Sequence, residues 1–431
     1  ARPILMVTLA PEVVGALDLI RTLSRSGVIV ALGHTAADFG QIAAAADAGA
    51  QPPVWRFGGF GTVGAGYHGS DGLTYRRDLE QAGGHEGGRL GFRGDSRIGV
   101  QASASFDARW SAQIQSVSRL DSEGKWTPQL SWTFLRYTPS DTLDMRIGRL
   151  GVDLYLDGDS RHVGYAFTTV RPAPEVLGGV TQDLFDGIDL TVRRSAGDGL
   201  LSLRLYGGHS RGDLSLYGNR FRPSDARRLG ATLDWVSDGL TLRAAWGDTY
   251  TSHDRALAPL AAALAAVPDV VAQQRAAQID ASHHLTFAGL GALYERGPFS
   301  AQALFSWSRF SQFPTYRGNG ASVLLAYRVG AWKPYISYSR LSLDPQEQRD
   351  LSLPAPLAGL QATYDRAVDR LTMNQRSIGV GVRYDFARNY ALKFQVDHID
   401  AARSMLIVDA RGMAARDVGM TLYSATLDFV F

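Results

Sequence analysis

Residues 423–431 read Tyr423-Ser424-Ala425-Thr426-Leu427-Asp428-Phe429-Val430-Phe431, and their odd positions carry mostly large apolar side chains. Their even positions are mostly polar, with Ser, Thr and Asp before the last Val. A period of two is the pattern of a β-strand whose two faces meet different surroundings. The stretch therefore predicts an amphipathic strand, and most of the chain repeats its pattern.

The same alternation fills the chain from Gln51 onward in runs of about ten residues, the length expected of a strand that crosses a membrane. In residues 130–134, Leu130, Trp132 and Phe134 fall on one face, while Ser and Thr fall on the other. A helix would need a period of 3.6, so this part of the chain is predicted to be all-β. Equivalent runs occupy residues 188–193, 201–206 and 392–397.

We expect sixteen antiparallel strands, because the connections between the alternating runs themselves alternate in length. Turns after even-numbered strands are tight, as at Ala196-Gly197-Asp198, whereas most loops after odd-numbered strands are long, as at residues 70–96 and 401–419. A soluble sandwich has no reason for this asymmetry, but a transmembrane barrel has short turns at one end and long loops at the other. The expected strands start near residues 54, 97, 109, 128, 142, 186, 199, 227, 239, 284, 298, 319, 331, 376, 389 and 420.

The composition agrees with such a barrel and excludes other classes. The 431 residues include no Cys, which excludes disulfides and thiolate metal sites. Lys and Arg number 44 against 42 Asp and Glu, a balance that argues against nucleic-acid binding. The longest uncharged apolar stretch, residues 256–268, is too short for a transmembrane helix of about 20 residues. A mean hydropathy of −0.10 is typical of alternating barrel strands.

Tryptophan placement predicts aromatic girdles. Trp and Tyr gather at both membrane–water interfaces because their rings are amphipathic. Seven of the eight Trp residues lie inside the expected strands, mostly near an end of the strand and on its apolar face. These seven are Trp55, Trp110, Trp132, Trp235, Trp246, Trp307 and Trp332.

With sixteen strands and a long loop after the fifth, residues 51–431 resemble the porins of Gram-negative bacteria over their whole length. The ending at Phe431 resembles the signal that the barrel-assembly machinery reads in outer-membrane proteins. The resemblance implies a β-barrel of the bacterial outer membrane, often homotrimeric, for passive diffusion of small hydrophilic solutes or ions. It also implies that the loop of about residues 152–185 folds inward and narrows the pore.

The alternation and this loop together predict the charges that line the pore. If the apolar faces meet lipid, the lumen receives more Arg and Lys than Asp side chains, which favours weak anion preference. The alternative is that Arg and Asp on neighbouring strands pair and stiffen the wall. The predicted constriction comprises Asp153, Asp157, Asp159, Arg161, His162 and Arg171. The predicted wall comprises Arg56, Arg97, Arg146, Arg193, Arg204, Arg228, Arg243, Arg383 and Lys393, with Asp144, Asp189, Asp234, Asp397 and Asp428.

Residues 1–50 follow a different pattern, in which each of two apolar runs precedes a helical stretch. This β-α-β-α order is typical of parallel α/β folds. The runs Val7-Thr8-Leu9-Ala10-Pro11-Glu12 and Val30-Ala31-Leu32-Gly33-His34-Thr35 resemble the N-acetylglucosamine-6-phosphate deacetylase family of amidohydrolases. The resemblance matches His34 to a metal ligand. The family's other sequence motifs, which carry its remaining metal ligands and its catalytic Asp, are absent. Because one imidazole does not hold a catalytic metal, we expect residues 1–50 to be a remnant without metal or cofactor.

Three short motifs match functional patterns but lack the required context. Residues 59–64 are a literal G-x-G-x-x-G that no helix follows, and residues 208–212 match G-x-S-x-G in an expected outer loop. Arg93-Gly94-Asp95 is an adhesion-type tripeptide in another expected loop, where coincidence explains it. Within the loops we expect helices at residues 254–280 and 357–371.

Three functions remain open on these grounds. The inward loop and the charged lumen favour a diffusion channel that is not an enzyme. A closed or adhesive barrel would act through its external loops and would need a plugged lumen. An amidohydrolase, suggested by residues 1–50 alone, would need the metal ligands that the sequence lacks.

Overall fold

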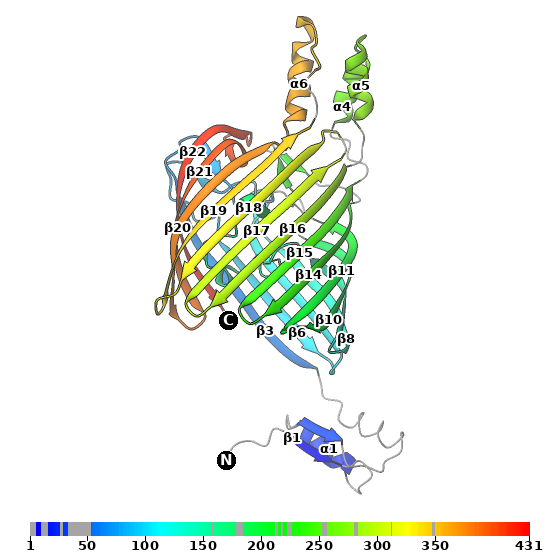
Figure 1. The fold of residues 1–431 in the computed structure, drawn as a ribbon, viewed down its shortest axis with the longest axis vertical. Helices are drawn as coiled ribbons and strands as arrows, with labels where there is room; N and C mark the ends of the chain where they lie inside the picture. The colour runs from blue at the N-terminus through cyan, green and yellow to red at the C-terminus, as the bar shows by residue number, and fades with distance from the viewer. Residues whose placement is uncertain are drawn as a thin grey trace.

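The computed structural model describes residues 6–9, 16–25, 29–32, 53–156, 158–177, 184–211, 214–216, 219–221, 226–251, 257–279, 283–311, 313–346 and 350–431. Within these ranges, sixteen antiparallel strands close into one barrel (Figure 1), as the alternation predicts. The ring closes between the last and the first of them, where Phe429 pairs with Gly61. In order around the barrel they are β3 (Val54–Tyr67), β6 (Arg97–Ser105), β7 (Trp110–Leu120), β8 (Trp126–Ser140), β9 (Leu143–Gly151), β10 (Leu184–Ala196), β11 (Gly199–Arg211), β14 (Ala226–Ser237), β15 (Leu240–Thr251), β16 (His283–Arg296), β17 (Phe299–Phe310), β18 (Tyr316–Tyr327), β19 (Trp332–Pro345), β20 (Met373–Ala387), β21 (Tyr390–Asp409) and β22 (Ala414–Val430).

The predicted strand starts lie within three residues of the observed ones, except for the last strand, which begins at Ala414. The expected long loop at residues 401–419 is wrong, because β21 and β22 extend as a hairpin beyond the other strands. The short strand β4 (Leu73–Tyr75) pairs with the end of β21, opposite Ile407. Burial of Ile407 in this contact explains why the hairpin continues.

Loop length divides the barrel into two ends. Five of the tight turns have a residue with positive φ, a conformation that Gly adopts without steric cost. Those residues are Gly197, Gly239, Gly297, Gly330 and Asn389. At the other end, the long loops carry β5 (His85–Glu86), β12 (Leu214–Leu216), β13 (Asn219–Phe221), η2 (Ala355–Leu357) and the expected helices α4 (Ala258–Ala265), α5 (Val270–Gln278) and α6 (Ala358–Val368). We call the end with the tight turns the turn end and the end with the long loops the loop end.

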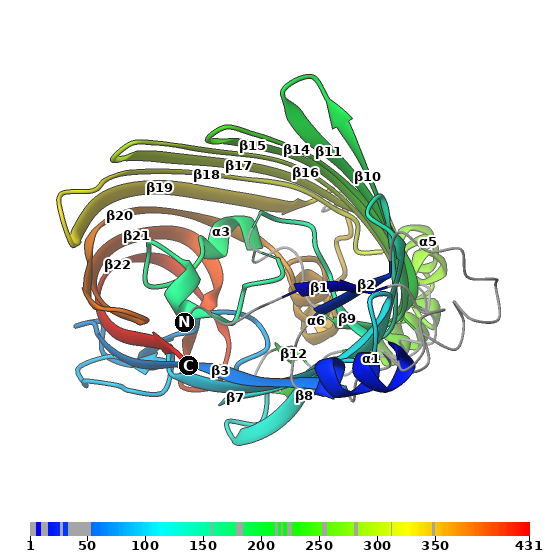
Figure 2. The same ribbon diagram turned by 90° about the horizontal axis from the view of Figure 1, so that it is seen from below.

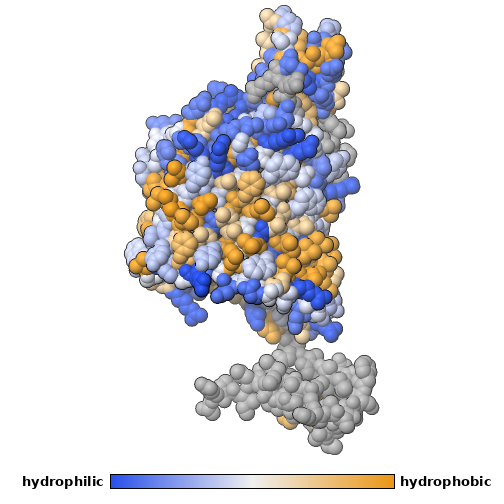
Figure 3. All heavy atoms as spheres, in the orientation of Figure 1, coloured by the Kyte–Doolittle hydropathy of each residue, from blue (hydrophilic) through white to orange (hydrophobic). Residues whose placement is uncertain are grey.

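Apolar side chains cover the outside of the barrel, and polar side chains line the inside. On β10, Ile188 is 47% exposed, whereas the next residue, Asp189, is 2% exposed. Figure 3 shows apolar side chains gathered in a band across the visible face of the barrel, with hydrophilic side chains above and below it. This is the reverse of a soluble sandwich and the arrangement expected of a barrel in lipid.

An aromatic row at the turn end confirms one predicted girdle. Trp332 and Tyr384 stack with ring centroids 4.0 Å apart, and contacts between neighbouring rings continue to Phe429 and Phe431. The seven expected Trp residues lie in strands, but the eighth does too, because β8 begins at Trp126 rather than near residue 128.

A β-bulge on β8 overturns the predicted faces of that strand. Trp132 pairs with Gln115 and Leu130 with Ser116, so Ser131 has no partner in the register. An inserted residue shifts all later side chains to the opposite face. Phe134 therefore points inward and is 8% exposed, although the alternation places it on the lipid face with Leu130.

The expected α/β segment is present in the described part of residues 1–50. Strand β1 (Met6–Leu9) pairs in parallel with β2 (Ile29–Leu32), and α1 (Ala16–Arg25) lies between them in the chain. His34 and the expected second helix lie outside the described residues. Among the described residues, no helix is long and apolar enough to cross a membrane.

Candidate pore and its inward loop

The described residues between β9 and β10, which are 152–156 and 158–177, run inside the barrel. The short helix η1 (Gly164–Ala166) contacts β3 and β22. Farther along, α3 (Pro174–Leu177) contacts β17, β18 and β19, on another part of the wall. Figure 2, seen from below, shows α3 within the ring of strands. The inward loop therefore crosses the lumen rather than lining one side.

The loop is first fixed to the wall through Asp153. Its two carboxylate oxygens accept hydrogen bonds from Arg243 at 2.6 Å and Arg204 at 2.9 Å. The same guanidinium groups bind wall carboxylates, Asp234 for Arg243 and Asp189 for Arg204. Because each charge has more than one partner, this network holds the start of the loop against β11 and β15.

Wall cations then hold the backbone of the loop. Lys393 Nζ lies 2.7 Å from the carbonyl of Gly164, and Arg383 donates to the carbonyls of Tyr165 and Phe167. The carbonyl of His162 accepts a hydrogen bond from Arg97 at 2.7 Å. Buried carbonyl groups need donors, and charged donors make the stronger hydrogen bonds. Three cations predicted as part of the wall therefore position the loop.

The second side-chain anchor is Arg171. Its guanidinium donates to Asp95 at 2.7 Å, to Asp397 at 3.0 Å and to Ser424 at 2.6 Å. Burial opposes ionisation of Asp95, but the Arg171 charge and a hydrogen bond from His85 outweigh it and hold the Asp95 pKa well below its usual value. The pair therefore remains ionised near neutral pH and ties the inward loop to β21 and β22.

Glu175, on α3, makes a third contact with the wall. Its carboxylate accepts hydrogen bonds from Ser339 at 2.7 Å, from Gln375 at 2.7 Å and from Ser377. These residues belong to β19 and β20, so α3 is held against a different part of the wall from Asp153. The described part of the loop is thus fixed at its start by Asp153, at Glu175, and at several points between them.

The predicted constriction residues have unequal roles in this arrangement. Asp153 and Arg171 anchor the loop, whereas His162 supplies a backbone carbonyl. Asp159 lies 3.7 Å from Arg204, and Arg161 donates to the carbonyl of Gly158 within the loop. Asp157 lies outside the described residues.

Most of the predicted wall charges pair with one another. Six of the nine cations lie within 4.0 Å of a carboxylate: Arg146, Arg193, Arg204, Arg243, Arg383 and Lys393. Arg228 donates to Thr249, and Asp144 also binds Arg136, a wall residue absent from the prediction. Of the described residues, no group of three or more His, Asp or Glu is placed to hold a metal ion.

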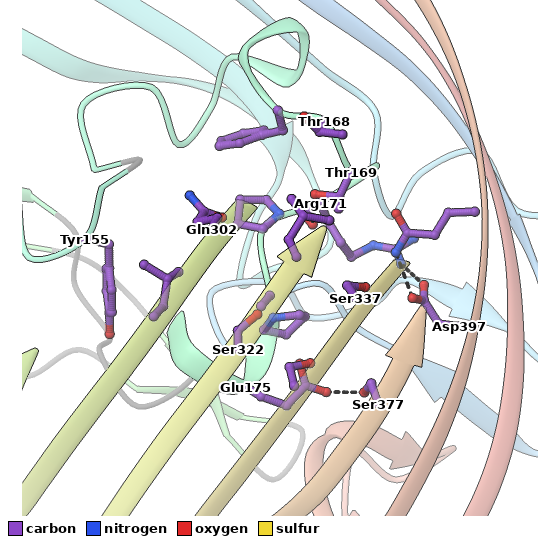
Figure 4. Close-up of a pocket in the computed structure, with 18 of the residues that line it drawn as sticks. Tyr155, Thr168, Thr169, Arg171, Glu175, Gln302, Ser322, Ser337, Ser377 and Asp397 are labelled. Carbon is purple, nitrogen blue, oxygen red and sulfur yellow. Dashed lines mark hydrogen bonds and ion pairs between the residues drawn. The ribbon is translucent and has the colours of Figure 1, made fainter. Parts of the chain in front are cut away.

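A cavity of about 200 Å³ lies beside the loop, between Arg171 and Glu175 on one side and β16 to β21 on the other. In Figure 4, Glu175 points toward Ser377 and Arg171 toward Asp397. The strand side of the cavity is rich in uncharged polar groups: Ser300, Gln302, Ser322, Ser337, Ser339, Ser377 and Gln395. The loop therefore leaves a cavity in the lumen next to it, and uncharged polar side chains line much of its strand side.

The sequence prediction missed three residues that shape the pore. Asp95 lies in the tripeptide Arg93-Gly94-Asp95, and it is buried rather than displayed for adhesion. Glu175 is an isolated acidic residue of the loop, and Phe134 sits on the misassigned face of β8. For Asp95, the available signal is that an acidic residue lies two positions before a strand whose first residue, Arg97, points inward.

The two glycine-containing motifs, G-x-G-x-x-G and G-x-S-x-G, fall in strands of the structure. Residues 59–64 lie within β3, so they form no phosphate-binding turn before a helix. Residues 208–211 belong to β11 rather than to an outer loop, and Gly212 lies outside the described residues. Neither segment has the strand-turn-helix geometry that its motif requires.

Sequence comparisons match one short segment of the chain. No family model matches the chain. One curated relative, N-acetylglucosamine-6-phosphate deacetylase from Vibrio furnissii, is 46% identical over 71 residues, which are 15% of this chain and 18% of that enzyme. The match therefore spans less than a fifth of the relative and does not carry its activity.

Solved structures match the barrel over 88% of this chain. The anion-selective porin from Comamonas acidovorans is 12% identical, with a TM-score of 0.53 and 100% of its chain covered. OmpF of Salmonella typhi, in complex with daunomycin, is 14% identical, with a TM-score of 0.53 and 97% covered. OmpT of Vibrio cholerae in its trimer form is 11% identical, with a TM-score of 0.50 and 100% covered. The chain therefore has the sixteen-stranded barrel fold of the outer-membrane porins.

Proposed function

We propose that residues 51–431 form a porin-type channel of the bacterial outer membrane, through which small hydrophilic solutes or ions diffuse passively. The inward loop carries this proposal, because it is anchored on several parts of the wall and leaves polar space beside it. Such a loop sets the cross-section of the passage without any moving part. The apolar outer face and the aromatic row at the turn end fit a barrel in lipid.

The charges suggest weak rather than strict ion selectivity. Fixed charges set the sign of permeant ions through the local potential, and pairing reduces that potential. The wall has nine predicted cations against five Asp residues, and the described part of the loop adds Asp153, Asp159 and Glu175 together with Arg161 and Arg171. We therefore propose a weak anion preference; of the structural neighbours above, one is titled an anion-selective porin.

Assembly and the N-terminal segment complete the proposal. We propose a homotrimer, since one structural neighbour is described in a trimer form, and recognition of the Phe431 ending by the barrel-assembly machinery. We propose that residues 1–50 are a remnant that resembles part of a deacetylase and adds no catalysis. Size-exclusion chromatography with light scattering checks the trimer, and deacetylase turnover would contradict the remnant.

Liposome swelling tests the channel and its size limit. Vesicles that contain the purified chain should swell in neutral sugars of low mass and stop swelling above a sharp mass limit. A variant that lacks residues 160–176 of the inward loop should shift the limit upward. A folded wild-type barrel that passes no solute would instead favour the closed or adhesive barrel, whose function would lie in the outer loops.

A further inference from the structure

Two serine hydroxyls in the cavity beside the inward loop have no partner among the described residues. Ser300 on β17 and Ser322 on β18 line this cavity, and they are 8% and 7% exposed. The structure gives neither hydroxyl a hydrogen bond with a described residue. Because a buried polar group without a partner costs free energy, such hydroxyls are found where water or a solute reaches them. Each one offers a donor and an acceptor to the occupant of the cavity.

The strand register places Ser322 within a neutral polar surface. Leu324, two positions farther along β18, lies between Gln302 of β17 and Ser337 of β19. Side chains two positions apart on a strand share a face, and directly opposed side chains on neighbouring strands lie about 5 Å apart. Three polar side chains therefore surround Leu324, and all of them line the cavity. Figure 4 shows Gln302, Ser322 and Ser337 on the strand side of the cavity.

The charged residues that line the cavity already have partners within the protein. Arg171 binds Asp397 and a second carboxylate. The two carboxylate oxygens of Glu175 accept hydrogen bonds from neutral donors on β19 and β20, and the residue is 1% exposed. Glu295, nearer the turn end, lies 3.9 Å from Lys333. The groups that remain available to a solute are therefore neutral hydroxyls rather than charges.

The inward loop supplies an aromatic ring to the same cavity. Tyr155 lines the cavity, and its hydroxyl donates to the carbonyl of Val176 at 2.9 Å. The ring also meets Phe287 edge-on, with centroids 5.3 Å apart. Because these two contacts hold Tyr155 in place, it offers the cavity carbon surface rather than a free hydroxyl. Leu304 and Leu324 add apolar surface from the strands.

We propose that the cavity beside the inward loop binds one ring of a neutral sugar. Hydroxyl groups of the sugar bond to Ser322 and Ser337, and its C–H face packs against Tyr155. Ser300 continues the polar surface toward the turn end. Pockets for drug-sized ligands measure roughly 300–1,000 Å³, so a cavity of about 200 Å³ suits a smaller solute of a single ring. The proposal rests on the channel proposed above and names the class of solute that this channel retains.

Saturation-transfer NMR of the full chain in detergent tests the sugar site. The three probes are glucose, the cationic glucosamine and the anionic glucuronate, which share a ring size and differ mainly in charge. We expect a saturable signal from glucose, with half-saturation in the millimolar range. At equal concentration and ionic strength, the other two probes should give signals at least fivefold weaker. Ser322→Ala should raise the half-saturation concentration of glucose about fivefold, because one hydrogen bond is lost.

Ser308→Ala is the matched control variant. Ser308 shares the inner face of β17 with Ser300 and is 6% exposed, but it does not line the cavity. Its change should therefore leave the half-saturation concentration of glucose unchanged. Equal signals from all three probes, or equal losses in the Ser308 and Ser322 variants, would overturn the proposal.

Two further outcomes separate this site from other kinds of site and from the channel itself. A stronger signal from glucosamine or from glucuronate than from glucose would contradict the proposal, because it identifies a cation or an anion site. Ion-current recording of the same protein reports on the channel separately. Current steps without a saturable glucose signal would remove the sugar site and leave the channel. A saturable signal that depends on Ser322, from a barrel without current steps, would support the sugar site and contradict the channel.

Discussion

Arg171 of the inward loop and Asp95 of the outer loop before β6 form an ion pair inside the barrel, with Nη2 and Oδ2 2.7 Å apart. Their side chains are 2% and 1% exposed. The ring Nε2 of His85, from the same outer loop, donates a further hydrogen bond to the Asp95 carboxylate across 2.9 Å. The pair therefore links the outer loop, the inward loop and the wall, and it fixes the position of the inward loop inside the barrel.

Removing one member of this pair should loosen the inward loop. Breaking a buried ion pair from one side costs about 3–5 kcal/mol, because the remaining charge is left without a partner. We expect Arg171→Gln to lower the thermal midpoint and to produce noisy, more variable single-channel currents. Arg388→Gln, at an exposed turn, is the control. If the folded Arg171→Gln variant gave currents as quiet as those of wild type, Arg171 would not anchor the inward loop.

The same pair predicts a pH dependence. Because the folded pKa of Asp95 lies well below its usual value, its contribution to stability is present above the unfolded pKa of about 3.9 and is lost as the pH falls through the folded pKa. We expect the difference in thermal midpoint between wild type and Asp95→Asn to be constant from pH 8 to about pH 5. It should shrink only below about pH 4. A difference that disappears between pH 7 and pH 5 would show that the pair titrates near neutrality.

The bulge at Ser131 predicts the environment of single side chains on β8. The chain has no native Cys, so a nitroxide label can be attached at one introduced Cys. A label at Thr133→Cys should respond to oxygen dissolved in lipid, like a label at Leu135→Cys. A label at Ser131→Cys should respond instead to a water-soluble nickel complex. If a label at residue 133 responds to the nickel complex as a label at residue 131 does, the alternation along β8 is unbroken and the strand has no bulge at Ser131.

The sequence predicts the strands, the two barrel ends and the inward loop because each depends on local period or spacing. The bulge at Ser131 is different, since Leu-Ser-Trp-Thr-Phe alternates perfectly and only pairing with β7 reveals the inserted residue. Likewise, the extension of β21 depends on its contact with β4, far away in the chain. Asp95 could not be assigned to the pore because its partner, Arg171, is 76 residues later and no local pattern connects them.

Barrel closure should depend on small residues beneath the aromatic row. A Cβ at Gly61 would lie 2.3 Å from the Phe429 ring, which leaves no room for a side chain. We expect Gly61→Val to reduce the fraction of chain that migrates as a folded, heat-modifiable barrel. Gly69→Val is the matched control, since nothing lies within 4 Å of a Cβ there. Equal folding yields for the two variants would contradict this account of the seam.

We propose that the fixed loop leaves an open, water-filled passage through the barrel. Single-channel recording in a planar bilayer, with a salt gradient across the membrane, tests it most directly. We predict discrete, long-lived current steps from residues 51–431 and a small reversal potential of the sign that indicates anion preference. A demonstrably folded barrel that gives no current steps would contradict the claim.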